Sequence, residues 1–126
     1  MFCKYNTINN VRILTGRAET IAHDEAHRER FDIAFARALG KLPVALELCI
    51  PFLKPNGLLV IPHGESYASE ISRSQHAMKE LQTVHQDSIS YPLNKDIRFT
   101  ALFFLKLRDT PERYPRKAGI PRKRPL

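Results

Sequence analysis

Two charged side chains stand at predicted turns of the chain, and each has a chemistry suited to holding a ligand. Arg37 ends the apolar segment Phe31–Arg37, and Glu19 ends the turn Thr15–Glu19. A carboxylate accepts hydrogen bonds from a ligand, whereas a guanidinium pairs with a carboxylate or a phosphate. The alternative is that both side chains cap loops or pair with each other.

These residues need a framework, and the apolar pattern predicts an open parallel sheet. Phe31–Arg37 is predicted as a buried strand, the spacing of Leu42–Leu53 predicts a helix, and Leu58–Ile61 predicts the next strand. This order is typical of a βαβ unit, in which ligands bind outside the carboxyl ends of the strands. Arg37 lies at such an end and is the first site candidate. His63 follows the next strand, where a lone histidine is more often a loop residue than a catalyst.

The remaining segments predict further elements. A short strand is expected at Val11–Leu14, a short exposed helix at Ala22–Arg30, and a weakly amphipathic helix at Ser66–Leu81 with its first residue as N-cap. The strands Val84–Tyr91 and Arg98–Leu107 are predicted to form an antiparallel hairpin. The second of these strands is the most apolar segment and is expected to be central and buried.

Positive charge is concentrated at the C-terminal end of the chain. The formal net charge of the 126 residues is +7, and Lys106 to Leu126 carries eight lysines and arginines against two acidic residues. A basic segment on a nearly neutral body favours a polyanionic partner, with RNA or DNA first. The alternative is a solvated, disordered end. Four prolines among the charges predict an extended tail that packs no core.

The sequence lacks the residues that several classes of enzyme and metal site require. The sequence has no phosphate loop, nucleophile elbow, cysteine ligand set or obvious carboxylate pair. His23 and His27 lie four apart, but Asp24 stands where a zinc protease helix needs glutamate, so we expect a solvated face and no metal. No apolar run is long enough for a membrane span, and the two cysteines suggest no disulfide framework, which predicts a cytoplasmic protein. Methyl transfer from a sulfonium donor to a ring nitrogen remains open, because it needs mainly positioning.

Four stretches together resemble one known family. They are Gly16–Glu19, Phe31–Ala38, Glu47–Gly57 and, most specifically, the C-terminal Thr110–Leu126. In order and spacing they resemble the bacterial 16S rRNA guanine-N7 methyltransferase family, also called glucose-inhibited division protein B. The resemblance runs from about residue 10 to the end of the chain.

The resemblance implies a cofactor, a partner and site residues. The cofactor is S-adenosylmethionine, and the partner is 16S rRNA or the small ribosomal subunit. Ala18 and Glu19 fall where the family contacts the adenosine part of the cofactor, and Arg37 falls on its cofactor-contacting arginine. Arg37 is expected to pair with the carboxylate of the donor or with an RNA phosphate. The expected RNA-binding residues are the cations of the tail: Arg113, Arg116, Lys117, Arg122, Lys123 and Arg124.

The chain also departs from the family pattern. It has no glycine-rich cofactor loop, and His63 stands where the family often has lysine. The expected fold is therefore α/β, a partial Rossmann-like class I methyltransferase sheet that lacks its first two strands and ends in the antiparallel hairpin. Residues 1–107 would form a truncated methyltransferase domain, and residues 108–126 a basic proline-rich tail. Strand edges at Val11–Leu14 and Phe31–Ala36 would lie unpaired unless the N-terminal segment docks there.

Three interpretations of function follow. The first is an S-adenosylmethionine-dependent methyltransferase of 16S rRNA that binds its cofactor weakly or not at all in this form. The second is a non-catalytic RNA-binding fragment that uses the basic tail. The third is a truncated open reading frame with no function of its own. The assignment to guanine N7 rests on the resemblance alone.

Overall fold

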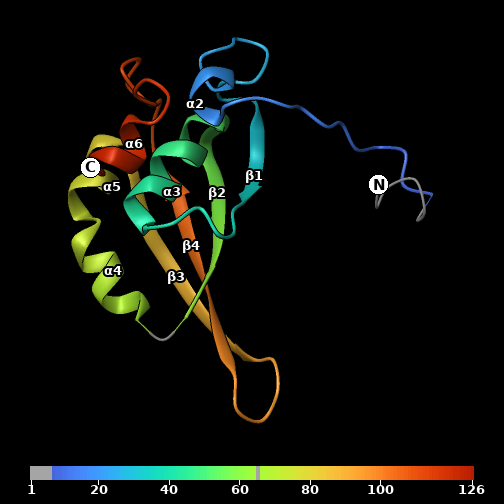
Figure 1. Cartoon of the computed structure of the whole chain (residues 1–126), viewed down its shortest axis with the longest axis vertical. Helices are drawn as coiled ribbons and strands as arrows, with labels where there is room; N and C mark the ends of the chain where they lie inside the picture. Colours follow the sequence, from blue (N-terminus) through green and yellow to red (C-terminus); the bar gives the residue numbers. More distant parts are fainter. Residues whose placement is uncertain (1–6, 65) are drawn as a thin grey trace.

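The computed structural model describes residues 7–64 and 66–126 of the chain. Among them, a mixed sheet is covered on one face by short helices (Figure 1). In chain order the elements are α2 (Ala18–Ile21), β1 (Phe31–Phe35), α3 (Leu42–Cys49), the 3-10 helix η1 (Ile50–Phe52), β2 (Leu53–His63), α4 (Tyr67–Arg73), α5 (Gln75–Glu80), β3 (Thr83–Pro92), β4 (Arg98–Lys106) and α6 (Ile120–Lys123). None of the described helices has the length and apolar character that crossing a membrane requires.

The four strands lie in the order β1-β2-β4-β3. β1 runs parallel to β2, and β4 runs antiparallel to both of its neighbours, β2 and β3. The predicted βαβ unit is therefore confirmed as β1-α3-β2, and the predicted hairpin is confirmed as β3-β4 with β4 inside the sheet. The α/β fold class is confirmed as well.

The hydrophobic core lies between the sheet and α3. All eight residues of α3 are buried, and Leu59 of β2 and Leu102 and Phe104 of β4 are fully buried in the same cluster. The helices α2, α4, α5 and α6 all contact α3, so the described helices form one layer. Because successive strand residues point to opposite faces, the residues that alternate with this core face the other side of the sheet, where the described chain has no helix.

The strand β1 is not buried, in contrast to the prediction. It lies at the edge of the sheet, and Phe35 is 77% exposed. The prediction was wrong because no described strand pairs with its outer side. The expectation of an unpaired edge at Phe31–Ala36 is confirmed. The strand expected at Val11–Leu14 does not form, because no described neighbour completes its hydrogen bonds, and Figure 1 shows this segment leading away from the sheet.

The bounds of several helices differ from the predicted ones because of local hydrogen bonds. The helix expected at Ala22–Arg30 does not form: these residues make a series of turns, and the helical turn α2 ends just before them, at Ile21. The helix expected at Ser66–Leu81 divides into α4 and α5 at Ser74, whose hydroxyl donates to the Glu70 carbonyl at 2.7 Å. Such bonds bend helices because they compete with the backbone pattern. The side chain of Ser66 forms no capping bond, so that prediction was wrong.

The C-terminal tail packs against the body, contrary to the expectation of a tail that packs no core. Thr110 and Tyr114 are buried, Tyr114 belongs to the core cluster, and Leu126 packs against it. Proline and arginine do not exclude such packing here, because groups on the body pair with Arg113 and Arg116 and donate to several carbonyls of the tail.

Candidate functional site

Glu19 is held in a polar pocket between α2 and the tail. The side chain is 5% exposed, and its Oε1 accepts hydrogen bonds from Nη2 of Arg17 at 2.8 Å and from the N–H of Gly119 at 3.0 Å. Burial raises the pKa of Glu19, but the bonds from Gly119 and Arg17 outweigh it and leave the pKa below its usual value. Glu19 is thus a carboxylate that already ties the tail to α2.

Arg37 does not contact Glu19. Its side chain is exposed and takes part in none of the hydrogen bonds or ion pairs found among the described residues. Figure 1 shows α2 beside the start of β1, whereas Arg37 follows the end of that strand. The loop after Arg37 does return toward α2, because Leu39 lines a small cavity together with Ala18 and Glu19. The structure therefore brings the loop after β1 to the cavity at Ala18 and Glu19, but not Arg37 itself.

The cavity that Ala18 and Glu19 share is too small by itself for a large cofactor. Its volume is about 180 Å³, whereas ligand pockets usually measure roughly 300–1,000 Å³. The only acid in its lining is Glu19, whose carboxylate is already engaged. Two larger cavities adjoin it, one of about 330 Å³ that Ala18 lines and one of about 440 Å³ that Glu19 lines.

The side chain of Arg28 holds the tail by hydrogen bonds to backbone carbonyls of the tail. Its Nη1 donates to the carbonyl of Tyr114 at 2.8 Å, and its Nη2 donates to those of Thr110 at 2.9 Å and Pro111 at 3.2 Å. His23 adds a bond from Nε2 to the Pro115 carbonyl at 2.7 Å. Sequence reasoning missed this role of Arg28, because the partners are backbone atoms more than 80 positions away and leave no side-chain pattern.

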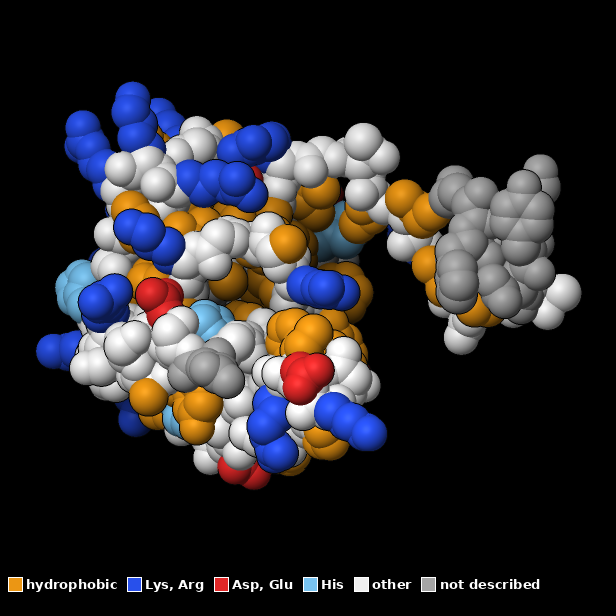
Figure 2. All heavy atoms as spheres, turned by 60° about the horizontal axis from the view of Figure 1, so that its bottom comes forward, with side chains coloured by type: hydrophobic (Ala, Val, Ile, Leu, Met, Phe, Trp, Pro, Cys, Tyr) orange, Lys and Arg blue, Asp and Glu red, His pale blue; other side chains and the backbone are white. Residues whose placement is uncertain are grey.

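The tail cations divide into two groups. Arg116 donates from Nε and Nη2 to the wholly buried carboxylate of Glu47, at 2.9 and 2.7 Å, and Arg113 pairs with Glu80 at 2.7 Å. The remaining four cations predicted to bind RNA are exposed and form none of the ion pairs found among the described residues: Lys117, Arg122, Lys123 and Arg124. Figure 2 shows lysine and arginine side chains at several places on the face that it draws, with a group of them at its upper left.

Lys106 is a buried cation that supports the same region. Its wholly buried Nζ donates to Glu29 and to the Leu53 carbonyl, both at 2.7 Å. Burial lowers the pKa of Lys106, and Glu29 offsets this only in part. The Glu29 carboxylate also accepts the N–H of Thr110 at 2.8 Å. The pair therefore joins the end of β4 to the beginning of the tail.

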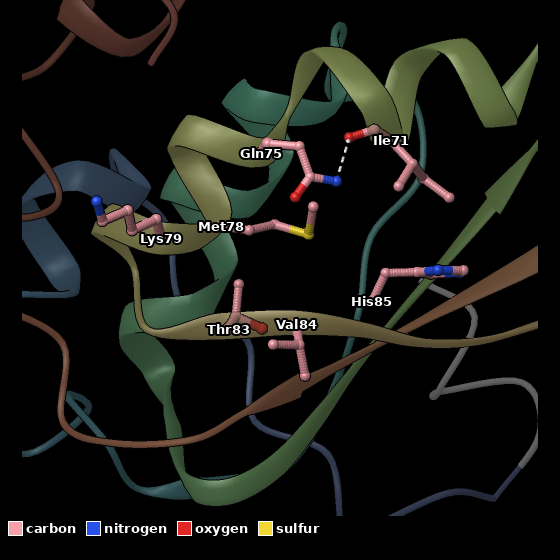
Figure 3. A pocket seen from close by; sticks show the side chains of 7 residues that line it. All are labelled: Ile71, Gln75, Met78, Lys79, Thr83, Val84 and His85. Atoms are coloured by element: carbon pink, nitrogen blue, oxygen red, sulfur yellow. Dashed lines mark hydrogen bonds between the residues drawn. The ribbon is translucent and has the colours of Figure 1, made fainter.

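A separate cavity of about 420 Å³ lies between α5 and β3. Figure 3 shows Met78 and Lys79 on the helix side and Thr83, Val84 and His85 along the strand. No predicted site residue lines this cavity. Among the described residues, no cluster of three histidine, cysteine or acidic side chains could hold a metal ion. Burial raises the pKa of Cys49 to about 12, which makes its thiol inert, and Cys3 lies outside the described residues.

Comparison with known proteins shows the family to which the chain belongs. The family model described as "GidB: rRNA small subunit methyltransferase G" matches residues 1–96. The chain belongs to this family. Ribosomal RNA small subunit methyltransferase G of Deinococcus deserti is 41% identical over 121 residues, which cover 94% of this chain and 49% of that protein. The enzyme of that name from Streptococcus gordonii is 41% identical over 120 residues, which cover 94% of this chain and 50% of that protein. The chain thus spans about half the length of the curated relatives it matches.

Solved structures of methyltransferases share the fold. An rRNA methylase from Streptococcus thermophilus matches with a TM-score of 0.53 and 20% identity over 85% of this chain and 64% of that one. M. jannaschii TYW2, solved in complex with AdoMet, matches with a TM-score of 0.55 and 18% identity over 83% of this chain and 50% of that one. The predicted class I methyltransferase architecture is therefore confirmed, with a four-stranded part of the sheet present in the described residues.

Proposed function

We propose that this chain is part of an S-adenosylmethionine-dependent methyltransferase that acts on guanine N7 of 16S rRNA in the cytoplasm. The observation that carries the proposal is the identity of about 40% to rRNA small subunit methyltransferases G along nearly the whole chain. Ala18, Glu19 and Arg37 are proposed to contribute to the cofactor site. The exposed guanidinium of Arg37 is available to a carboxylate or a phosphate.

We infer further that the chain alone binds the cofactor weakly or not at all. The cavity that Ala18 and Glu19 share measures only about 180 Å³, and the carboxylate of Glu19 already accepts the N–H of Gly119. Calorimetric titration with S-adenosylhomocysteine tests this. We expect no measurable heat of binding, and a micromolar dissociation constant for this chain by itself would contradict the inference.

A second candidate function is RNA binding by the basic tail without catalysis. It is favoured by the exposure of Lys117, Arg122 and Lys123 outside the ion pairs that hold the tail in place. Affinity for a 16S rRNA fragment should then fall steeply with salt, because phosphate contacts release counterions. Binding that is absent at low salt, or that does not change with salt, would argue against this function. Deletion of residues 113–126 is unsuitable as a test, because it removes Tyr114 from the core.

A further inference from the structure

The hairpin of β3 and β4 extends beyond the carboxyl edge of the two parallel strands. β2 ends at His63, which pairs with Thr100 of β4. Past this point β3 and β4 continue together through the pair Tyr91–Phe99 to the loop 93–97, and Figure 1 shows the hairpin projecting past the end of β2. Ligands of open sheets bind outside the carboxyl ends of the parallel strands. The end of the hairpin therefore stands at the edge where a substrate would lie.

The hairpin tip, which we define as residues 91–99, carries an aromatic pair outside the core. The rings of Tyr91 and Phe99 are stacked, with their centroids 6.4 Å apart and an angle of 25° between their planes. Both side chains are partly exposed, and neither belongs to the core cluster. In the adjoining loop, Leu93 and Ile97 are exposed by 60% and 46%. Aromatic rings at the surface are platforms on which nucleic-acid bases stack.

The hairpin tip is also positively charged. Lys95 and Arg98 are exposed and form none of the ion pairs found among the described residues, and Asp96 is the one acid in residues 91–99. Figure 2, which turns this end of the molecule forward, shows lysine and arginine side chains beside exposed apolar ones in its lower part. Cations next to aromatic rings suit a strand in which phosphates alternate with bases. This combination favours nucleic acid over an apolar protein surface as the partner.

Hydrogen bonds fix the shape of the loop at the hairpin tip. Oδ1 of Asn94 accepts the N–H groups of Asp96 and Ile97, both at 2.9 Å. The N–H of Leu93 donates to the carbonyl of Ile97, also at 2.9 Å. Asparagine favours turns because its side chain bonds the nearby backbone in this way. The loop is thus ordered before a ligand arrives, which lowers the entropy cost of binding.

We propose that the hairpin tip is a binding site for single-stranded RNA. A base stacks on the aromatic pair Tyr91–Phe99, and Lys95 and Arg98 bind neighbouring phosphates. The choice of RNA rests on the proposed function, and the site holds the strand at the carboxyl edge of the parallel strands. It is separate from the basic tail, because the tail follows Lys106 at the opposite end of β4.

The test is binding of the full 126-residue chain to a short single-stranded fragment of 16S rRNA, measured by fluorescence anisotropy. Phe99→Leu keeps an apolar side chain opposite Tyr91 but removes the flat ring, so it should weaken binding about tenfold. Phe99→Tyr keeps the ring and should retain the affinity. Phe103→Leu is the matched control, because Phe103 is partly exposed on the same face of β4 but lies outside the hairpin tip. Its affinity should be unchanged.

Two further measurements identify the groups that the hairpin tip contacts. Lys95→Ala and Arg98→Ala should each reduce the salt slope by roughly 0.7 to 1, as expected for one lost phosphate contact. Replacing single bases of the RNA by abasic sites should reveal one position at which the loss of affinity matches that of Phe99→Leu. The two losses should not add at that position, because the ring and the base then belong to one contact.

Four results would overturn the hairpin site: no RNA binding at low salt, binding that Phe99→Leu leaves unchanged, an equal loss in Phe103→Leu, or losses that add at every abasic position. Urea unfolding of each variant confirms that it is folded before it is compared. An RNA strand of unrelated sequence separates the site from the proposed function, because stacking tolerates any base. Equal, hairpin-dependent affinity for both strands supports the site and counts against 16S rRNA as the specific substrate.

Discussion

Arg116 holds the buried carboxylate of Glu47 by two guanidinium nitrogens, and its own backbone N–H adds a third bond at 2.8 Å. Glu47 lies in α3 with no exposed surface, so the tail provides the counter-charge for an acid in the core. The hydrogen bond with Glu47 raises the pKa of Arg116, and burial opposes it only in part. Arg116 was predicted as an RNA-binding residue, and this geometry favours a structural role in its place.

Arg116→Ala should therefore lower the stability of the protein. Removing one partner of a buried pair leaves an uncompensated charge and typically costs about 3–5 kcal/mol. We expect a loss of about 3 kcal/mol in urea unfolding, because Arg116 is itself partly exposed. Lys117→Ala is the control, since Lys117 is exposed and should change stability by less than about 0.5 kcal/mol. Equal effects of the two substitutions would contradict the structural role of Arg116.

The RNA contacts are expected from the other tail cations. Replacement of Lys117, Arg122 and Lys123 together by alanine should weaken binding of a 16S rRNA fragment and reduce the salt slope by about one for each lost phosphate contact. Fluorescence anisotropy across a salt series measures both. A control variant removes three exposed cations outside the tail and the hairpin tip, Arg12, Lys41 and Lys79, and should retain the original slope. If both variants lose affinity alike, the binding is a general effect of net charge.

Acid should destabilise the protein through Glu29. Burial raises the pKa of Glu29, but Lys106 and the N–H of Thr110 outweigh it, so the folded-state pKa lies below the ordinary value of 4.5. A lowered carboxyl pKa contributes stability above the unfolded value, and that contribution is lost as the pH falls through the folded value. Thermal unfolding should show the loss below about pH 4.5.

The variant Glu29→Gln isolates this contribution. It should cost about 2–3 kcal/mol at neutral pH, because it leaves the buried ammonium of Lys106 with only carbonyl partners. Its melting temperature should also depend less on pH below about 5 than that of the original chain. Glu112→Gln, at an exposed position, serves as the control. A Glu29→Gln protein with the original acid sensitivity would show that other carboxylates dominate.

Gly57 should tolerate no side chain. A Cβ there would lie 2.8 Å from the Lys54 carbonyl and 3.1 Å from that of Asp32, where β2 shifts register beside β1. Gly57→Ala should therefore cost about 1–3 kcal/mol in urea unfolding, since backbone atoms must move. Gly64→Ala is the matched control, because a Cβ at Gly64 meets nothing within 4 Å. A stable Gly57→Ala variant would indicate that the start of β2 adapts readily.

The local spacing of apolar residues correctly predicted the helices and strands in which that spacing is regular. The β3–β4 hairpin and the β1-α3-β2 unit follow from alternation and helical spacing in residues that do become core, such as Leu46 and Phe104. The burial of Phe31–Phe35 could not be predicted from its apolar composition, because burial depends on a neighbouring strand. Val11–Leu14 failed as a strand for the same reason.

The sequence predicted some residues of the candidate site, but it did not predict which other residues they contact. Ala18 and Glu19 do line a cavity with the loop after β1, but Leu39 reaches it and Arg37 does not. The roles of Ala18, Glu19 and Arg37 toward a cofactor stay predictions, as does the boundary between a domain and a tail at residue 108. The packing of the tail was missed because its partners, Arg28 and Glu47, are far away in sequence and carry no motif.

The tail contacts also bear on when the protein can fold during synthesis. The bond from Gly119 to Glu19 spans 100 positions, and the pair of Arg116 with Glu47 spans 69. A growing chain cannot close these contacts until residues 116–119 have been synthesised and have left the exit tunnel. A nascent product that stops before Arg116 would therefore leave Glu47 in the core without its counter-charge, and such a product is a substrate for chaperones and proteases.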